Sequence, residues 1–150
     1  MIRIICIGKI KEKYFIDAIN EYQKRLSKYT KLEIIELPDF DADINTILKK
    51  ESELILKHIK DRSYVITLEI EGNELSSIEL SKKIDNILNT NSDITFIIGG
   101  SYGLSDEVKN ISNYKLSFSK MTFPHQLFRV ILLEQIYRSY KILNNETYHK

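Results

Sequence analysis

The feature that most constrains this chain is a regular alternation of short apolar runs with longer stretches of helical periodicity. The runs are β-branched or aromatic, are bounded by turn-forming residues, and predict strands at Ile2–Ile7, Leu32–Leu37, Tyr64–Ile70, Ile94–Ile98 and Tyr114–Phe118. The intervening stretches predict helices at Tyr14–Lys28, Ile44–Lys60, Ile78–Leu88, Asp106–Ile111 and Pro124–Leu143. Because parallel strands need crossover connections, this order predicts an α/β fold with a mostly parallel sheet of five to six strands and helices on both faces.

Length and composition narrow the class of protein. At 150 residues and 43% hydrophobic, the chain fits one domain spanning residues 1–150. It contains no run of about 20 apolar residues, and its first residues resemble a strand more than a signal peptide, so we expect a cytoplasmic protein without a membrane segment. One Cys, three His and no paired-ligand spacing argue against a metal site, and Cys6 is interpreted as core.

The net charge of +1 conceals a division along the chain. Residues 8–31 carry seven Lys/Arg against three acids, and residues 109–150 carry seven against two, whereas residues 32–108 carry seven against sixteen. Local potential steers a polyanion more than total charge does, so the basic ends are compatible with a phosphate-binding face. Ordinary solvated helix surfaces would explain the same division.

The last predicted helix is apolar around most of its circumference. Its apolar positions are Leu127, Phe128, Val130, Ile131, Leu132, Leu133, Ile136, Tyr137, Tyr140, Ile142 and Leu143. A helix that covers one face of a sheet shows a single apolar stripe, so this pattern indicates burial on a second side and favours a homodimer. The alternative is a central helix buried within one chain.

Three segments that follow predicted strands carry residues unusual for simple turns. They are residues 68–72, 99–105 and 118–124, and all three should meet at the carboxyl edge of the sheet, where open α/β sheets bind ligands. Gly99 and Gly100 would let a ligand approach the backbone closely. Their spacing differs from the dinucleotide fingerprint G-x-G-x-x-G, which disfavours a nicotinamide cofactor.

These residues also resemble a known family. The blocks that carry the resemblance are residues 97–105, 116–130 and 133–138, together with 8–14, 66–70 and the ending Tyr148-His149-Lys150. Across nearly the whole chain they are similar to the ribosomal large subunit methyltransferase H family of SPOUT enzymes. The family's frequent Lys after the matching glycine is Asn73 here, and its Gly-x-Pro before the final Tyr-His is Asn145-Glu146-Thr147.

The resemblance implies a fold, a reaction and a set of site residues. It implies a C-terminal trefoil knot, a homodimer, and methyl transfer from S-adenosylmethionine to N3 of a pseudouridine in 23S ribosomal RNA, on assembled ribosomes. The implied cofactor contacts are Leu68, Gly99, Phe118, Ser119, Lys120, Met121, Thr122 and Phe123. Apolar walls and a few placed polar groups suit an adenosine.

The acceptor base must lose a proton, which directs attention to the basic and aromatic residues near the C-terminus. We expect His149 to act as general base, Arg129 to stabilise the anion and Tyr148 to orient the base. We expect Arg138, Lys150, Lys9 and Lys11 to contact RNA, although Arg138 could simply pair with Glu134 one helical turn away. His125 is interpreted as a structural residue whose ring bonds nearby backbone.

Two other functions remain compatible with the sequence. The chain could be an RNA-binding or ribosome-binding module without catalytic activity, or a dinucleotide-dependent oxidoreductase. The weak net charge predicts poor binding to free RNA, so assembled ribosomes should be the better substrate.

Overall fold

The computed structural model describes all 150 residues and confirms the predicted order of elements. The strands are β1 (Ile2–Ile7), β2 (Leu32–Leu37), β3 (Tyr64–Glu74), β4 (Ile94–Ile98) and β5 (Tyr114–Ser117). The helices are α1 (Lys13–Leu26), α2 (Ile44–His58), α3 (Ser77–Thr90), α4 (Asp106–Asn110) and α5 (His125–Leu143). No helix is long and apolar enough to cross a membrane.

All strand pairs are parallel, and the sheet order is β2-β1-β4-β3-β5. The connection that follows β1 leads to β2 at one edge of the sheet. The connection that follows β4 leads to β5 at the opposite edge. The centre of the sheet is therefore a switch point, where diverging connections open a crevice beyond the carboxyl ends of the strands. Ile7 and Ile98 end the two central strands at this crevice.

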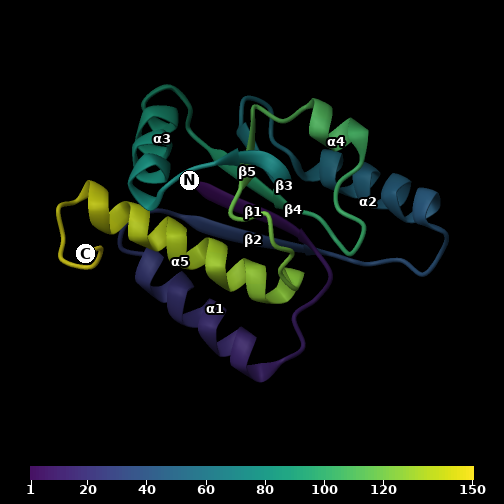
Figure 1. The fold of residues 1–150 in the computed structure, drawn as a ribbon, viewed down its shortest axis with the longest axis horizontal. Coiled ribbons are helices and arrows are strands. Elements are labelled where there is room, and N and C mark those ends of the chain that lie inside the picture. Colours follow the sequence, from purple (N-terminus) through teal and green to yellow (C-terminus); the bar gives the residue numbers. More distant parts are fainter.

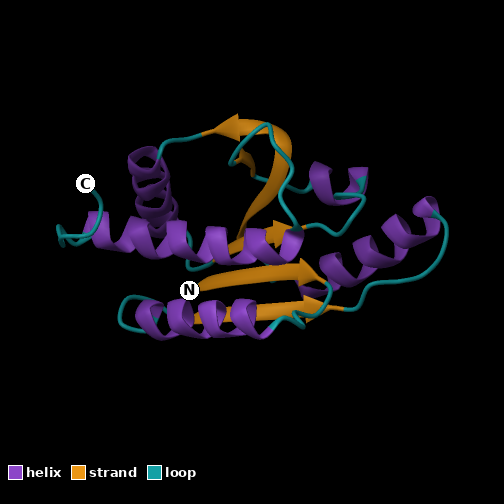
Figure 2. Cartoon of the chain, turned by 60° about the horizontal axis from the view of Figure 1, so that its bottom comes forward, coloured by secondary structure: helices purple, strands orange, loops and turns teal.

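Helices cover the two faces of the sheet unequally (Figures 1 and 2). On one face α5 lies between α1 and α3, and this side contains a cluster of 17 buried residues. On the other face α2 and α4 cover a smaller cluster of eight. The α/β fold class with helices on both faces is thus confirmed, with five strands, whereas the trefoil knot stays a prediction.

Local signals explain where several helices begin. Ser76 accepts a hydrogen bond from the backbone N–H of Glu79, and the Glu79 side chain accepts one from the Ser76 N–H, which is the capping box that the sequence predicts at α3. Asp43 caps α2 in the same way by accepting from Thr46 N–H.

β3 runs to Glu74, past the predicted end at Ile70. The strand is longer because it resumes its pairing with β5 after a bulge that the sequence pattern did not reveal. Leu68 and Asn73 both pair with Leu116 of β5, so the residues between them bulge out at the carboxyl edge. A Cβ on Gly72 would lie 2.8 Å from the backbone of Lys115, and the Asn73 side chain donates to the Lys115 carbonyl. Asn73 therefore fastens the bulge to β5.

α5 is a central helix within one chain, which is the alternative explanation of its apolar pattern. Leu132, Leu133 and Ile136 are fully buried against the sheet and the neighbouring helices. Leu127 and Ile131 lie on the opposite side by helical periodicity and are only partly buried. α5 therefore has a second apolar side, but this side extends over fewer residues of the helix than the sequence pattern suggests.

Candidate active site

A cavity of about 460 Å³ lies at the carboxyl edge of the sheet, beside the N-terminal end of α5. It is lined by three segments far apart in sequence, together with residues from α4 and α5. The lining residues are Leu68, Glu69, Ile70, Glu71, Ile98, Gly99, Gly100, Ser101, Gly103, Leu104, Lys109, Leu116, Phe118, Ser119, Met121, Thr122, Phe123, His125 and Phe128. The three strand-end segments that the sequence singled out therefore meet at one place.

The cavity contains all the predicted cofactor residues except Lys120. Their assignment to a cofactor stays a prediction. Glu69 and Glu71 belong to the 68–72 segment but were given no role of their own, and Lys109 was missed; these three residues give the cavity a charged side. The extended bulge of β3 places the two glutamates there, and its register could not be read from an apolar pattern.

The loop from Phe118 to Phe123 is held by packing and by short-range hydrogen bonds. The Phe128 ring lies 5.0 Å from that of Phe118 and 5.9 Å from that of Phe123, measured between centroids. The Ser119 hydroxyl accepts from Met121 N–H at 3.0 Å. The Met121 side chain is 74% exposed, so it can close over a ligand without leaving a packed position.

Gly99 has a steric reason to be glycine. A Cβ there would lie 2.6 Å from the carbonyl oxygen of Gly103, which is closer than real Cβ contacts. The Gly100 carbonyl accepts from Gly103 N–H, so residues 100–103 form a tight turn against the end of β4. This turn exposes backbone groups to the cavity.

Three titratable side chains gather where β1 and β4 end. A methyl group added at Gly8 would lie 3.8 Å from Nε2 of His125 and 4.0 Å from Oδ2 of Asp39, and one added at Gly100 would lie 3.2 Å from Oε2 of Glu51. Burial and the Arg129 charge lower the pKa of His125, and Asp39 offsets this in part. Burial and the neighbouring Asp39 raise the pKa of Glu51.

Neither His125 nor Glu51 makes a side-chain hydrogen bond within the chain. The expectation that the His125 ring bonds nearby backbone is therefore wrong. Glu51 was missed, although the sequence holds a signal for it. Ile47, Glu51 and Ile55 follow one another at intervals of four, so a carboxylate occupies the buried stripe of α2.

Arg129 is 1% exposed, and its side chain donates hydrogen bonds to the backbone at the end of β1. Its guanidinium donates to Glu36 at 2.7 Å and to the carbonyls of Ile7 and Gly8 at 2.9 and 2.6 Å. These contacts satisfy two of its nitrogens and point it away from solvent, so a direct contact with the anion of an RNA base, as the sequence suggested, does not fit this position. Arg129 holds the Gly8 loop.

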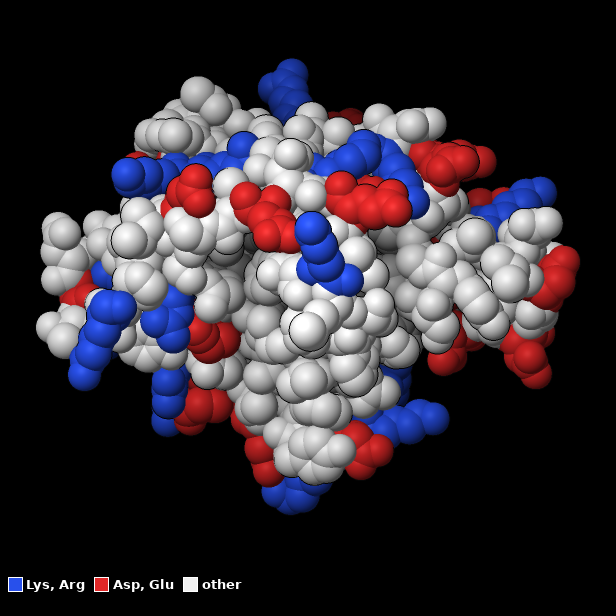
Figure 3. All heavy atoms as spheres, in the orientation of Figure 1, with Lys and Arg blue, Asp and Glu red and all other residues white.

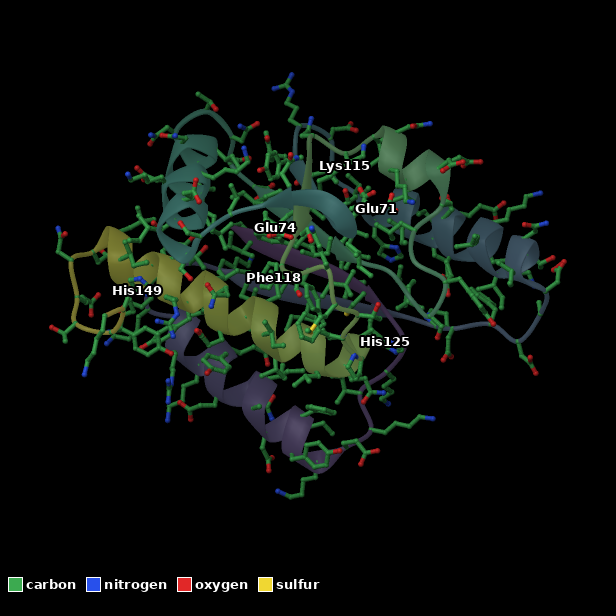
Figure 4. The ribbon with its side chains drawn as sticks, viewed as in Figure 1. Glu71, Glu74, Lys115, Phe118, His125 and His149 are labelled. Carbon is green, nitrogen blue, oxygen red and sulfur yellow. The ribbon has the colours of Figure 1, made fainter.

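The C-terminal residues lie at the other end of α5, and Figure 4 shows His125 and His149 at opposite ends of this helix. Arg138 pairs with Glu134 at 2.8 Å, as the i,i+4 spacing predicted, and its Nη1 is 3.1 Å from Nδ1 of His149. Its guanidinium also lies 4.7 Å from the centre of the Tyr148 ring. Within one chain these residues form their own cluster and do not reach the cavity.

The remaining predicted contacts are on the surface. Lys9, Lys11 and Lys150 are exposed, and their RNA role is not tested by the structure. No group of three or more His, Cys, Asp or Glu residues is arranged to hold a metal ion.

A family model and several named proteins match this chain over nearly its whole length. A family model described as a predicted SPOUT methyltransferase matches residues 1–149. A protein named ribosomal RNA large subunit methyltransferase H from Clostridium botulinum is 58% identical, and one of the same name from Clostridium perfringens is 56% identical. A Methanococcus maripaludis protein with a provisional form of this name is 61% identical. Each alignment covers 99% of both chains.

Solved structures with a similar fold are more distant in sequence. A probable methylase family protein from Haemophilus influenzae superposes with a TM-score of 0.60 at 16% identity, covering 99% of this chain and 70% of the other. A tRNA (m1G37) methyltransferase from Aquifex aeolicus gives 0.53 at 16% identity, covering 91% and 69%. At this identity the likeness concerns the fold alone.

Proposed function

This chain belongs to the SPOUT methyltransferases, within the ribosomal RNA large subunit methyltransferase H family, and from that membership we propose that it methylates large-subunit ribosomal RNA with S-adenosylmethionine. The observation that carries the proposal is the convergence of Leu68, Gly99 and the 118–123 loop on one cavity. A cavity that can hold a cofactor is expected of an enzyme and favours catalysis over a module that only binds RNA. The charge pattern alone would have left that alternative open.

The residues present fit S-adenosylmethionine. The cavity volume lies within the range of about 300–1,000 Å³ typical of cofactor sites. Leu68, Leu116 and Phe118 offer apolar walls to an adenine, and backbone groups of the 119–122 loop offer donors and acceptors to its edge. The cofactor supplies an electrophilic methyl group, so the protein has mainly to position the acceptor.

We propose N3 of a pseudouridine in 23S ribosomal RNA, presented by assembled ribosomes, as the acceptor. The support is the family membership and the modest charge of the chain, which gives little affinity for free RNA. A cytoplasmic site of action follows from that substrate. Lys9 and Lys11 are exposed in the loop after β1, next to the cavity end of the sheet, and suit contacts with phosphates.

The proposal includes a homodimer whose active site needs both copies. Residues 125 and 138 are separated by about 20 Å along the axis of α5, at 1.5 Å of rise per residue. The tail with Tyr148 and His149 therefore cannot act on a methyl group held in the cavity of its own chain. A second copy packed against α5 in the opposite direction would bring its tail to that cavity.

The outer surface of α5 suits such packing. Leu127, Val130 and Ile131 are partly exposed apolar residues near the cavity, and Tyr14 of α1 is 65% exposed nearby. Figure 3 shows that the middle of this face is largely free of charged side chains. A contiguous apolar surface of this kind is typical of a protein interface.

Within that arrangement, the partner's tail would contact the target nucleotide. Tyr148 can stack on an extruded base, while Arg138 and Lys150 neutralise phosphate or base anion. Arg129 contributes by holding the Gly8 loop and does not contact RNA.

Calorimetry and methyl transfer test the proposal in sequence. We expect binding of S-adenosylmethionine and of S-adenosylhomocysteine, no binding of NAD, and transfer of labelled methyl to ribosomes that lack the modification. An isolated RNA hairpin should be a much poorer substrate. Cofactor binding without transfer to any ribosomal substrate would support the non-catalytic module instead, and NAD binding would support an oxidoreductase.

Subunit mixing tests the shared site. A variant lacking residues 148–150 should be inactive as a homodimer, and a Gly99→Ala variant should have strongly reduced activity at limiting S-adenosylmethionine. Co-expressed, they should regain activity, because one of the two sites in the mixed dimer combines an intact cavity with an intact tail. No recovery in mixed dimers of confirmed composition would mean that each chain acts alone.

A further inference from the structure

Methylation of an imide nitrogen releases a proton, and the site needs a group to receive it. The N3–H bond breaks, its electron pair forms the new N–C bond, and the methyl–sulfur bond breaks with its pair remaining on sulfur as a neutral thioether. Because the imide is mostly protonated at neutral pH, its proton has to leave before or during attack. The acceptor should therefore lie beside the cavity and have a free lone pair.

His125 meets these conditions within the chain. Its ring lines the cavity together with Gly99 and the 118–123 loop, and neither ring nitrogen makes a hydrogen bond to the protein. The lowered pKa of its imidazole keeps the ring neutral, and so able to accept a proton, at neutral pH.

Glu51 lies beside the same corner. The residue is 4% exposed and makes no side-chain hydrogen bond, and its carboxylate lies next to Gly100, which lines the cavity. Its oxygens are not among the buried atoms that lack a partner, so they keep contact with solvent, and burial together with the neighbouring Asp39 raises the pKa of Glu51. Asp39 is the carboxylate that lies beside both Glu51 and His125.

Resting on the proposed methyl transfer, we propose that His125 is the catalytic base that takes the N3 proton, and that Asp39 is a positioning residue that stabilises the imidazolium formed. The charged groups that act on His125 are Arg129 on its own helix and Asp39 after β2, and Glu51 of α2 lies beside Asp39. Arg129 opposes protonation, but its charge is already engaged by Glu36. Asp39 favours the protonated ring.

His149, the base expected from the sequence, is less suited to this task. Arg138 Nη1 lies 3.1 Å from its Nδ1, so one ring nitrogen is already engaged, and the ring lies at the end of α5 away from the cavity (Figure 4). His149 retains a role in holding the target nucleotide. The two histidines therefore separate into a proton acceptor at one end of α5 and an RNA contact at the other.

The test compares His125→Asn with His149→Asn in single-turnover methyl transfer to ribosomes across a pH series. We expect His125→Asn to lower the rate by about 100-fold or more, the lower range of general-base contributions. The logarithm of the residual rate of His125→Asn should rise linearly with pH over the range in which the wild-type rate is constant. In a second variant, His125→Gly, added imidazole should partly restore the rate of methyl transfer. His149→Asn should keep the wild-type pH profile.

Two readouts besides activity complete the test. Binding of S-adenosylhomocysteine to His125→Asn should change less than threefold. NMR titration of the three histidines in the free protein should give His125 a pKa below the ordinary value, and Asp39→Asn should lower that pKa further because a stabilising negative charge is lost. In Asp39→Asn the pH–rate midpoint should move to lower pH accordingly.

The outcomes are distinct. Wild-type activity with an unchanged rate and pH profile in His125→Asn would overturn the inference while leaving the proposed function intact. Loss of S-adenosylhomocysteine binding in His125→Asn would also overturn it, by making His125 a cofactor contact. Wild-type protein that transfers no methyl group to ribosomes would overturn the proposed function itself, and the NMR titration would still report whether Asp39 acts on His125.

Discussion

The two ends of α5 differ in how their polar side chains are partnered. At the N-terminal end the His125 ring has no hydrogen bond, and Nε of Arg129 is buried without a partner. At the C-terminal end Arg138 contacts both Glu134 and His149. Because unpaired buried polar groups are costly, the first end is arranged for a ligand, whereas the second is satisfied in the free chain and must exchange contacts to bind RNA.

The largest expected effect is on stability, from the two arginines of α5. Arg129→Ala should lower the free energy of unfolding by about 3–5 kcal/mol, because Glu36 loses its cationic partner and keeps only the Ile10 N–H, and two carbonyls at the end of β1 lose a donor. Arg138→Ala, the matched control, should lower it by at most about 1 kcal/mol, since its pair with Glu134 is partly solvated. Urea denaturation measures the free energy of unfolding of both variants. Equal decreases in the two variants would contradict the proposed difference between the two ends of α5.

The cavity next to the N-terminal end should respond strongly to one added methyl group. Gly99→Ala should weaken binding of S-adenosylhomocysteine at least about tenfold, or about 1.4 kcal/mol, because its Cβ would force the Gly103 carbonyl to move. Ser101→Ala in the same exposed turn should change binding less than threefold. Calorimetry on both variants provides the check, and wild-type affinity in Gly99→Ala would mean that this turn does not shape the site.

A smaller effect concerns pH. Since burial and Arg129 lower the pKa of His125, the folded protein binds this proton less readily than the unfolded chain does. The stability that His125 contributes is therefore complete above its ordinary pKa of about 6.5 and is lost as pH falls from there toward the folded-state pKa. Unfolding of wild type and His125→Asn across this range should diverge, with wild type losing more; parallel curves would show that the ring is freely solvated.

The smallest effect is expected in the tail. Asn145 has a φ of 53°, in the left-handed region where the family usually has glycine. Asn145→Gly should leave stability within about 0.5 kcal/mol, and Asn145→Ala should cost about 1 kcal/mol because Ala lacks the short polar side chain that lets Asn adopt the left-handed conformation. Thr147→Ala is the control, and thermal unfolding is the measurement. An Asn145→Ala protein more stable than wild type would contradict the prediction.

Sequence patterns predicted the elements whose signals are local. The β-branched runs located all five strands, and the Ser76 to Glu79 spacing located a helix start. They also predicted which loops would meet, since parallel strands share a carboxyl edge. The features they missed depend on register or tertiary position: the β3 bulge before Asn73, the burial of Arg129, and the approach of Asp39 and His125 to Gly8.

The central place of α5 has a consequence for how the protein forms. Five members of the larger core cluster belong to this last helix: Leu132, Leu133, Ile136, Tyr137 and Tyr140. The face of the sheet that they cover stays open until they arrive, so a nascent chain would display an apolar surface for most of its synthesis. Such long-range closure slows folding and favours aggregation, which makes this face the natural place for a chaperone to act.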